Sequence, residues 1–321
     1  MRVLVTGGAG YIGSHTAAAL LAAGHEVVVL DALRTTDAAL VPDGAAFVRG
    51  DVANPSAWLD DVGPLDACLH FAALIEAGES MRVPQRFFAT NTAGSLRLAE
   101  ALVDAGVSRF VLSSTAAVYG EPQQVPITED HPLDPTNAYG ESKLLVERAL
   151  GWLAACTSLR TAVLRYFNAA GATAGRGERH DPETHLIPLV LQAATGARPN
   201  VRLFGTDYPT ADGTCVRDYV HVADLADAHV LALEALTDHR TLTCNLGSET
   251  GSTVREVIDA VQRVTGRTVP VVEAPRRDGD PAVLVASAAR ARSLLGWSPA
   301  RGDLDTIVAD AHRWHSGAPP V

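Results

Sequence analysis

The sequence contains few cysteines, and none of them are close together. The four cysteines are Cys68, Cys156, Cys215 and Cys244, and they form no Cys-x-x-Cys motif. This spacing argues against a zinc knuckle and against a dithiol redox centre. We therefore expect buried, unpaired thiols, as is usual for proteins of a reducing compartment. We also expect no metal site.

Hydrophobic runs long enough to cross a membrane are missing too, since no apolar stretch approaches the roughly 20 residues that a spanning helix needs. The sequence starts at once with the apolar residues 2–6, without the basic and apolar regions of a signal peptide. Positive charge is scarce, because the net charge is −11 and the isoelectric point is about 5.4. An acidic surface disfavours nucleic acid and anionic membranes as partners. These features predict a cytoplasmic protein that binds neither.

The rest of the composition is that of an ordinary globular protein. The 321 residues are 47% hydrophobic and 20% charged, which argues against disordered, collagen-like and coiled-coil chains. A chain of this length forms one large domain or two unequal ones.

In the first half, short apolar runs alternate with longer amphipathic segments. The predicted strands span 2–6, 26–30, 46–49, 66–71, 108–113 and 159–166, and the predicted helices span 11–23, 55–61, 84–105 and 137–155. Continuous Val and Leu runs are typical of strands that are buried on both faces. Strand–helix alternation predicts an α/β fold with a doubly wound parallel sheet.

The second half is less regular. Residues 170–184 are rich in glycine and polar residues and predict a long loop. The predicted helices that follow span 185–196, 222–236, 253–265, 288–295 and 303–315, and the strands 201–204, 241–246 and 269–273. We expect a first domain over 1–169, to which 218–246 returns, and a smaller mixed α/β domain over 170–321.

A glycine-rich turn follows the first predicted strand. Gly7, Gly10 and Gly13 form Gly-x-x-Gly-x-x-Gly between this strand and a predicted helix. Small residues allow a tight turn and a close backbone approach to a pyrophosphate, which the helix N-terminus then attracts. The context of strand, glycine turn and helix predicts a dinucleotide site in a Rossmann-type sheet.

Two carboxylates follow the next strands. Asp31 ends the second predicted strand, 18 residues after Gly13. A carboxylate there accepts hydrogen bonds from the adenosine ribose and repels a 2′-phosphate, so it favours NAD over NADP. Asp51 and Val52 follow the third strand, where a side chain can meet the adenine, although a turn or cap role for Asp51 fits the pattern equally well.

A tyrosine and a lysine share one face of a predicted helix. Tyr139 and Lys143 are four residues apart, hence one turn apart. A phenol is a weak base at neutral pH, but a nearby ammonium and a positively charged nicotinamide favour its ionised form. Ser113, Ser114 and Thr115 end the preceding strand, where ligands bind in such sheets. The Thr115 hydroxyl can hydrogen-bond the reacting oxygen, while an ordinary turn is the alternative for the serines.

These motifs resemble the extended short-chain dehydrogenase/reductase superfamily. Within it, the chain is similar to the UDP-glucose 4-epimerase family of NAD-dependent epimerases, over nearly its whole length. The segments that carry this finer resemblance are 165–168 (Arg-Tyr-Phe-Asn), 204–208, 212–222, 274–280 and 295–297.

The resemblance implies a tightly bound, recycled NAD and a UDP-hexose substrate, UDP-galactose or UDP-glucose. It implies inversion at C4 through a transient 4-keto sugar, with no net redox change. Tyr139 would be the base, Lys143 its electrostatic support and Thr115 an assisting hydroxyl.

The resemblance also implies two sets of contacts. The cofactor contacts are Gly7, Gly10, Tyr11, Ile12, Gly13, Asp31, Asp51, Val52, Phe71, Ala72, Asn91, Ser113, Tyr139, Lys143 and Tyr166. The substrate contacts are Thr115, Tyr139, Asn168, His185, Leu186, Phe204, Arg217, Arg277, Asp280 and Leu284. Arg217 and Arg277 would hold the diphosphate, and Asp280 the uridine ribose. His70 precedes Phe71 and Ala72 in the loop that matches the family after the fourth strand. A packed core histidine is as good an interpretation of His70 as a contact at this site.

Several points separate this chain from relatives and rivals. Ile75 stands where some relatives carry a lysine. Leu284 stands at a position whose size helps to decide whether an N-acetyl group fits, and leucine leaves this open. Sugar 4,6-dehydratases need an acid and a base after the threonine, whereas Ala116 and Ala117 cannot titrate. A UDP-glucuronate 4-epimerase would need a cation near the sugar, for which Arg82 and the arginines of 170–184 are candidates.

Two expectations concern the protein as a whole. A catalytically idle nucleotide sensor is the alternative from another class, although the intact Tyr139 and Lys143 pair disfavours it. By resemblance we expect a homodimer, formed through the helices at 84–105 and 137–155.

Overall fold

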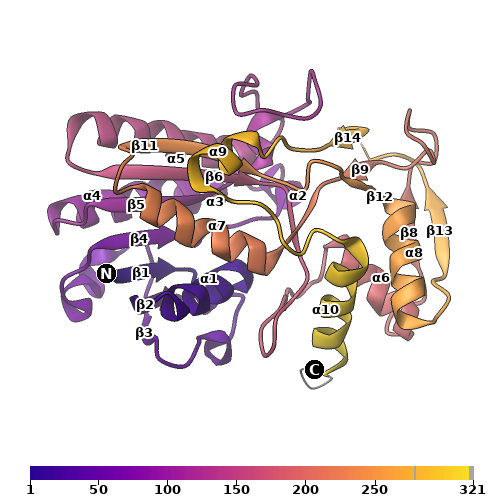
Figure 1. The fold of residues 1–321 in the computed structure, drawn as a ribbon, viewed down its shortest axis with the longest axis horizontal. Helices are drawn as coiled ribbons and strands as arrows, with labels where there is room; N and C mark the ends of the chain where they lie inside the picture. The colour runs from indigo at the N-terminus through magenta and orange to yellow at the C-terminus, as the bar shows by residue number, and fades with distance from the viewer. Residues whose placement is uncertain (278–279, 318–321) are drawn as a thin grey trace.

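The computed structural model describes residues 1–277 and 280–317 and is built around one seven-stranded parallel sheet (Figure 1). Asp278 and Gly279 of the 274–280 motif lie outside the described residues. The strands in spatial order are β11 (Thr241–Leu246), β6 (Arg160–Tyr166), β5 (Arg109–Thr115), β4 (Ala67–His70), β1 (Arg2–Thr6), β2 (Glu26–Asp31) and β3 (Ala46–Arg49). All neighbouring pairs run parallel.

The strand order reverses direction at β1. From β1 the chain moves outward to β2 and β3, then crosses back to β4 and continues to β5 and β6. This is the Rossmann strand order, and it opens a crevice between the carboxyl ends of β1 and β4. The predicted doubly wound α/β fold is therefore confirmed.

Helices cover both faces of the sheet. On one face, α1 (Tyr11–Ala22) and α7 (Val222–Ala235) bury Leu20 and Leu233 against strand residues such as Val111. On the other face, α4 (Ser95–Asp104) and α5 (Ala138–Cys156) bury Leu98 and Leu150 in a second apolar core. Burial on both faces explains why the strands are almost uninterrupted apolar runs.

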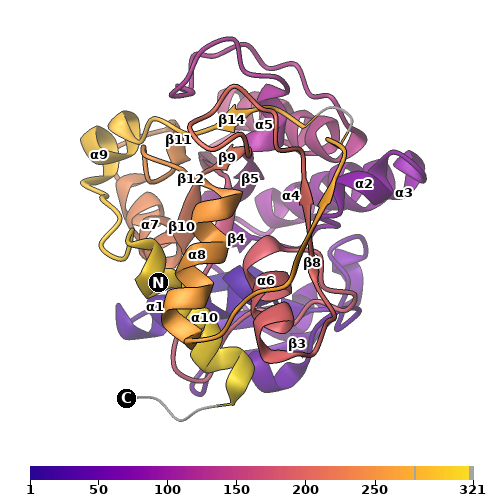
Figure 2. The same ribbon diagram turned by 90° about the vertical axis from the view of Figure 1, so that its right-hand side faces the viewer.

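A second, smaller group of elements packs beside the carboxyl end of the sheet, on the right in Figure 1 and facing the viewer in Figure 2. Its helices are α6 (Leu186–Thr195), α8 (Val254–Thr265) and α10 (Leu304–Ser316), and they share a core that includes Ile187, Val257 and Ile307. Its small sheets are β8 (Val201–Phe204) with β13 (Val271–Ala274), β12 (Ser252–Thr253) with β9 (Val216–Arg217) and β14 (Val283–Leu284), and β10 (Tyr219–His221) with β7 (Asn168–Ala170).

The remaining elements are short. They are η1 (Ala38–Leu40), η2 (Pro55–Ala57), η3 (Leu59–Val62), α2 (Ala77–Ser80), α3 (Pro84–Phe87), η4 (Phe88–Gly94), η5 (Ala116–Tyr119) and α9 (Ala289–Leu295).

Two predicted helices differ from the structure. The helix expected over 55–61 is two 3₁₀ turns, η2 and η3, which meet at the buried Trp58 and end before Gly63. The helix expected over 84–105 is α3, the π-helical η4 and α4 in succession, and a π segment of this kind is frequent at functional sites.

The cysteine prediction is wrong at one position. Cys68, Cys215 and Cys244 are buried, but Cys156 is exposed because it ends α5 at the protein surface.

None of the helices in the described part of the chain is long and apolar enough to span a bilayer. The cytoplasmic location stays a prediction. The segment 218–246 places β11 beside β6 in the main sheet, while the domain boundary at residue 170 stays a prediction.

A valine in the centre of β5 tests the contribution of the sheet core. Val111→Ala removes two methyl groups from a fully buried site, and we expect it to lower the free energy of unfolding by about 2 kcal/mol. The matched control Val272→Ala, at a β13 side chain that is 48% exposed, should cost less than about 1 kcal/mol. Urea unfolding followed by circular dichroism measures both, and equal losses would contradict the assignment of this core.

Candidate functional site

The glycine turn after β1 is built from close backbone contacts. Gly7 has φ of 67°, a conformation that favours glycine. A Cβ on Gly13 would lie 2.2 Å from the Gly7 carbonyl oxygen, and a Cβ on Gly7 would lie 2.7 Å from the Ala72 nitrogen. The turn therefore packs against itself and against the segment that follows β4. A side chain at either glycine would collide with the neighbouring backbone and displace the turn at the start of α1.

The start of α1 suits an anion. Gly10 is the N-cap and supplies no side-chain hydrogen bond, and Tyr11, Ile12 and Gly13 form the first turn. First-turn N–H groups have no partner within their own helix, so a phosphate placed there accepts hydrogen bonds from them. The described residues of the turn thus fit the dinucleotide that the sequence predicts.

The two predicted carboxylates lie at the ends of β2 and β3. Asp31 accepts hydrogen bonds from the backbone N–H of Ala9, at 3.1 Å, and of Leu33, at 2.8 Å, which fixes its carboxylate beside the glycine turn. Asp51 pairs with Arg34 at 2.6 Å and accepts the N–H of Ala53 at 2.9 Å. The geometry therefore gives Asp51 a turn role. Its neighbour Val52 is buried in the second core.

Thr115 and Tyr139 meet where β5 ends. Asn137 caps α5 by accepting the N–H of Gly140 at 2.9 Å. A Cβ on Gly140 would lie 2.5 Å from the Ala117 carbonyl oxygen, so the start of α5 packs closely on η5. Burial raises the pKa of the Tyr139 hydroxyl, and a hydrogen bond with Thr115 opposes this rise. Because burial disfavours the phenolate, Tyr139 needs a positive charge nearby to act as a base.

Lys143 is the natural source of that charge. It is 3% exposed and is the only lysine in the chain. Burial lowers the pKa of its ammonium to about 8, and the negative charge of Glu147 opposes this fall. Glu147 lies one turn further along α5, where the sequence interpretation overlooked it, although its spacing of four residues from Lys143 is a readable signal.

A buried ion pair stands behind Lys143. Arg165 and Glu147 contact each other at 2.6 Å, with each side chain only 6% exposed. Ser114 donates a further hydrogen bond to Glu147. Burial lowers the pKa of Arg165, but the hydrogen bonds and the charge of Glu147 more than reverse this effect. The carboxylate near Lys143 is therefore held in place by a permanent positive charge.

Ser113 and Tyr166 join neighbouring strand ends through a hydrogen bond between their hydroxyl groups. Burial raises the pKa of Tyr166, so it stays neutral. The strand that follows Tyr166 begins with Asn168, whose amide donates to the Asp218 carbonyl at 2.9 Å.

Asn91 and His70 support the site from beneath. The Asn91 amide accepts the Leu74 N–H at 2.8 Å and donates to the Leu74 carbonyl at 2.9 Å and to Ser142 at 3.0 Å. It thereby ties the segment after Phe71 and Ala72 to α5. His70 is 1% exposed and hydrogen-bonds Thr6 and Ser95, each at 2.7 Å. These contacts favour a core histidine over a ligand contact.

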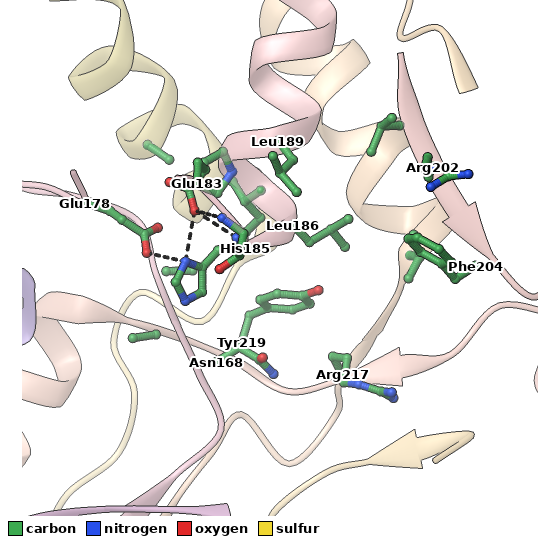
Figure 3. Close-up of a pocket in the computed structure, with 18 of the residues that line it drawn as sticks. Asn168, Glu178, Glu183, His185, Leu186, Leu189, Arg202, Phe204, Arg217 and Tyr219 are labelled. Carbon is green, nitrogen blue, oxygen red and sulfur yellow. Dashed lines mark hydrogen bonds and ion pairs between the residues drawn. The ribbon is translucent and has the colours of Figure 1, made fainter. Parts of the chain in front are cut away.

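A pocket of about 440 Å³ lies between the small sheets and α6. Figure 3 shows His185 and its glutamates on one wall and Phe204 and Arg217 on the other. The predicted substrate residues that line it are Asn168, His185, Leu186, Phe204, Arg217, Arg277 and Asp280. Leu284 is not among the described lining residues, because it packs on a small apolar cluster around Tyr119. The sequence interpretation missed the lining residues Glu178, Glu183, Arg198, Arg202 and Tyr219.

Two arginines dominate one side of the pocket. Arg217 forms an ion pair with Asp280, and the Arg277 guanidinium lies 4.0 Å from the centre of the Phe204 ring. Three separate elements thus bring two cations, one carboxylate and an aromatic ring into one cavity. Such a set is suited to a phosphorylated ligand that also carries a flat ring.

Tyr11 connects the two halves of the site. Its hydroxyl donates a 2.6 Å hydrogen bond to the carbonyl of Gly171. The first turn of α1 therefore touches the beginning of the loop that runs along the pocket. Burial and the charges of Glu178 and Glu183 raise the pKa of this phenol.

Comparison with known proteins agrees with this geometry. The model of the NAD dependent epimerase/dehydratase family matches residues 3–247. The chain belongs to this family. Its relatives in the NAD-dependent epimerase/dehydratase family include the UDP-glucose 4-epimerase of Streptomyces lividans, which is 53% identical over 99% of this chain and 97% of that protein.

Solved structures of the same family superpose closely. A crystal structure of a UDP-glucose 4-epimerase has a TM-score of 0.96 at 46% identity, and covers 99% of this chain and 98% of its own. The Stenotrophomonas maltophila UDP-glucose-4-epimerase with bound NAD and formylated UDP-arabinopyranose has a TM-score of 0.95 at 44% identity, covering 99% and 98%. The resemblance expected from the sequence is confirmed.

The single lysine makes the charge at the site directly measurable. With ¹⁵N-labelled lysine, the Nζ signal belongs to Lys143 alone, and we expect it to titrate near pH 8 because of burial. The ammonium is charged below that pH, so the positive charge that the resemblance assigns to the support of Tyr139 should be lost as the pH rises through about 8. Glu147→Gln should move the titration to lower pH, since it removes the opposing negative charge.

Glu141→Gln, on the same helix, is the control and should leave the titration unchanged. A Lys143 titration near the usual lysine value, about 10.4, would contradict the burial of this ammonium.

Proposed function

We propose that this chain catalyses the NAD-dependent 4-epimerisation of a UDP-hexose, interconverting UDP-galactose and UDP-glucose. The observation that carries the proposal is the position of Tyr139. It lies against Thr115 at the carboxyl end of β5, one turn before Lys143 and at the sheet edge that also holds the glycine turn.

NAD fits the cradle formed by the glycine turn, the start of α1 and Asp31. When bound, it supplies the acceptor that takes a hydride from C4 of the sugar and returns it. We assign the remaining predicted cofactor contacts, including Ser113, Asn91 and Tyr166, to this side of the site.

The proton steps belong to the protein. In the proposed reaction Tyr139 removes the proton of the 4-hydroxyl and later gives it back. Thr115 hydrogen-bonds the same oxygen, and the Lys143 ammonium stabilises the phenolate. Each step needs the phenol to lie close to its partners in a buried place, where charges interact strongly.

The pocket beside this edge would hold the nucleotide part of the substrate. Arg217 and Arg277 come from separate elements and can face a diphosphate from two sides. Asp280 would accept hydrogen bonds from the ribose, and Phe204 offers a flat apolar surface to the base. Asn168 links this pocket to the catalytic edge.

An elimination reaction is disfavoured by the residues that follow Thr115. Ala116 and Ala117 open the 3₁₀ turn η5, so the positions next to the threonine carry no acid or base. Other UDP-sugars remain alternative substrates on the same scaffold. UDP-N-acetylglucosamine and UDP-glucuronate are the two that the sequence leaves open.

A single substitution tests the proposed role of the tyrosine. Tyr139→Phe should lower the rate of epimerisation by about 10²–10⁴-fold, because it removes the proton acceptor, while NAD content stays unchanged. For the assay, the purified protein is incubated without added cofactor with UDP-galactose, UDP-N-acetylgalactosamine and UDP-glucuronate in separate reactions, and the products are identified. Tyr208→Phe, whose ring lies under Arg276, is the control. Full activity of Tyr139→Phe would overturn the proposal.

We also infer a homodimer formed through α4 and α5. A groove of about 570 Å³ lies between these helices, and its walls include Leu96, Val103, Trp152 and Leu153. Trp152 is 74% exposed. An indole left in water next to an apolar groove favours a partner surface, and a second copy of the same helices offers a matching one.

Light scattering tests the dimer. We expect the wild-type protein at twice the chain mass of 33.7 kDa. Trp152→Glu should have the mass of one chain, because dimer formation would bury the new carboxylate without an opposite charge beside it. Val272→Glu introduces the same charge at an exposed site of β13 and should stay dimeric. A wild-type protein at the mass of one chain rules the dimer out.

A further inference from the structure

The loop between β7 and α6 carries a cluster of carboxylates and imidazoles, of which only His185 is among the predicted substrate contacts. Glu178, His180, Glu183 and His185 lie within eight residues of sequence. One oxygen of Glu178 lies 2.9 Å from Nδ1 of His180 and 2.7 Å from Nδ1 of His185. Figure 3 shows the His185 ring facing both glutamates.

Three of these side chains converge on one small volume. The possible ligand atoms of Glu178, His180 and His185 all lie within 4.8 Å of one another. The two imidazole rings have centres 5.0 Å apart. Ligand atoms around a metal ion with bonds of about 2.0–2.2 Å are slightly over 3 Å apart, so only a small opening of the cluster would admit an ion.

The backbone holds these ligands in place independently of any ion. Glu178 has a side chain that is only 6% exposed, and its carbonyl accepts a 2.8 Å hydrogen bond from the Trp314 indole of α10. His185 is the N-cap of α6, so the helix fixes its position. A site whose ligands are already oriented loses little conformational entropy when it binds an ion.

The charge of the cluster also favours a cation. Glu183 places a second carboxylate oxygen 3.0 Å from Nδ1 of His185. Two carboxylates in a partly buried place need compensating positive charge. One divalent cation supplies that charge in full while both imidazoles remain neutral ligands.

We propose that Glu178, His180 and His185 bind a divalent transition-metal ion of the zinc type, with water or Glu183 in the fourth position. Two imidazoles and one carboxylate are typical ligands of Zn²⁺, whereas Mg²⁺ and Ca²⁺ prefer oxygen ligands alone. The earlier expectation of no metal site followed from the cysteine spacing, and this candidate uses no cysteine.

The position of the ion suggests what it does. Glu178, Glu183 and His185 line the pocket together with Leu186, the first residue of α6. An ion held by the loop and by the helix start would fix this wall of the pocket. It would act by positioning and would touch no reacting atom. The inference stands independently of the proposed function.

The test is a metal titration of the NAD-loaded protein after treatment with a chelator and dialysis. Isothermal titration calorimetry with ZnCl₂ should show one Zn²⁺ per chain, and Co²⁺ should give the visible absorption bands of a tetrahedral site. His180→Ala and Glu178→Gln should each weaken Zn²⁺ binding by at least about tenfold. His239→Ala, in the turn between α7 and β11, is the control and should bind as the wild type does.

NAD content and melting temperature are recorded for every variant. A variant that loses NAD is set aside, and His180→Gln is measured in its place. Stoichiometric binding that both substitutions weaken supports the site. Failure of the wild type to bind Zn²⁺, or unchanged affinity in either variant, overturns it. Because binding is read without turnover, its failure is distinct from a failure of the proposed epimerase activity.

Discussion

The site depends on one constraint, which is that all seven strands of the main sheet run parallel. Parallel strands place all their carboxyl ends along a single edge, and the reversal of strand order at β1 leaves a crevice there. Gly7 follows β1, Asp31 ends β2, Thr115 ends β5 and Tyr166 ends β6. Residues that are more than one hundred positions apart in the sequence therefore lie along the same edge, because the strands that carry them are parallel neighbours.

A buried network of charges stabilises this edge from below. The Lys143 ammonium is costly to bury, and the negative charge of Glu147, which is itself paired with Arg165, offsets part of this cost. Arg165 also donates to the Tyr119 hydroxyl at 3.0 Å, and this hydroxyl donates to Asn245 of β11 at 2.6 Å. The return of β11 to the main sheet thus helps to support the site, because Asn245 completes the hydrogen-bond chain that starts at Arg165. A buried charge such as Arg165 is destabilising when its hydrogen bonds are incomplete.

The second group of elements turns this edge into an enclosed site. Strand β7 begins two residues after β6 ends, so Asn168 stands both at the catalytic edge and in the wall of the pocket. The hydrogen bond from Tyr11 to Gly171 fastens the start of the long loop to the glycine turn. The loop that follows then brings Glu178 and His185 to the opposite wall. The pocket proposed for the nucleotide and the edge proposed for the chemistry are thereby adjacent but rest on different structural elements.

The sequence by itself determined the strands and helices of the sheet and the glycine turn. Their signals are local: apolar runs that match buried strands, glycines at fixed spacing, and Tyr139 and Lys143 one turn apart. The family of the chain was also readable from short motifs. The short strands β7, β9, β10, β12 and β14 were not predicted, because each of two or three residues is defined by its pairing partner and carries no periodicity.

Only the tertiary structure decided which polar residues share a cavity. Glu147 and Arg165 lie on different elements, and only packing shows that they pair beneath Lys143. His70 looks like a ligand residue in the sequence, yet its two hydrogen bonds make it part of the core. Leu284 packs on an apolar cluster, and Cys156 lies at the surface. Which partners a side chain meets is a property of the folded chain, and no local pattern in the sequence encodes it.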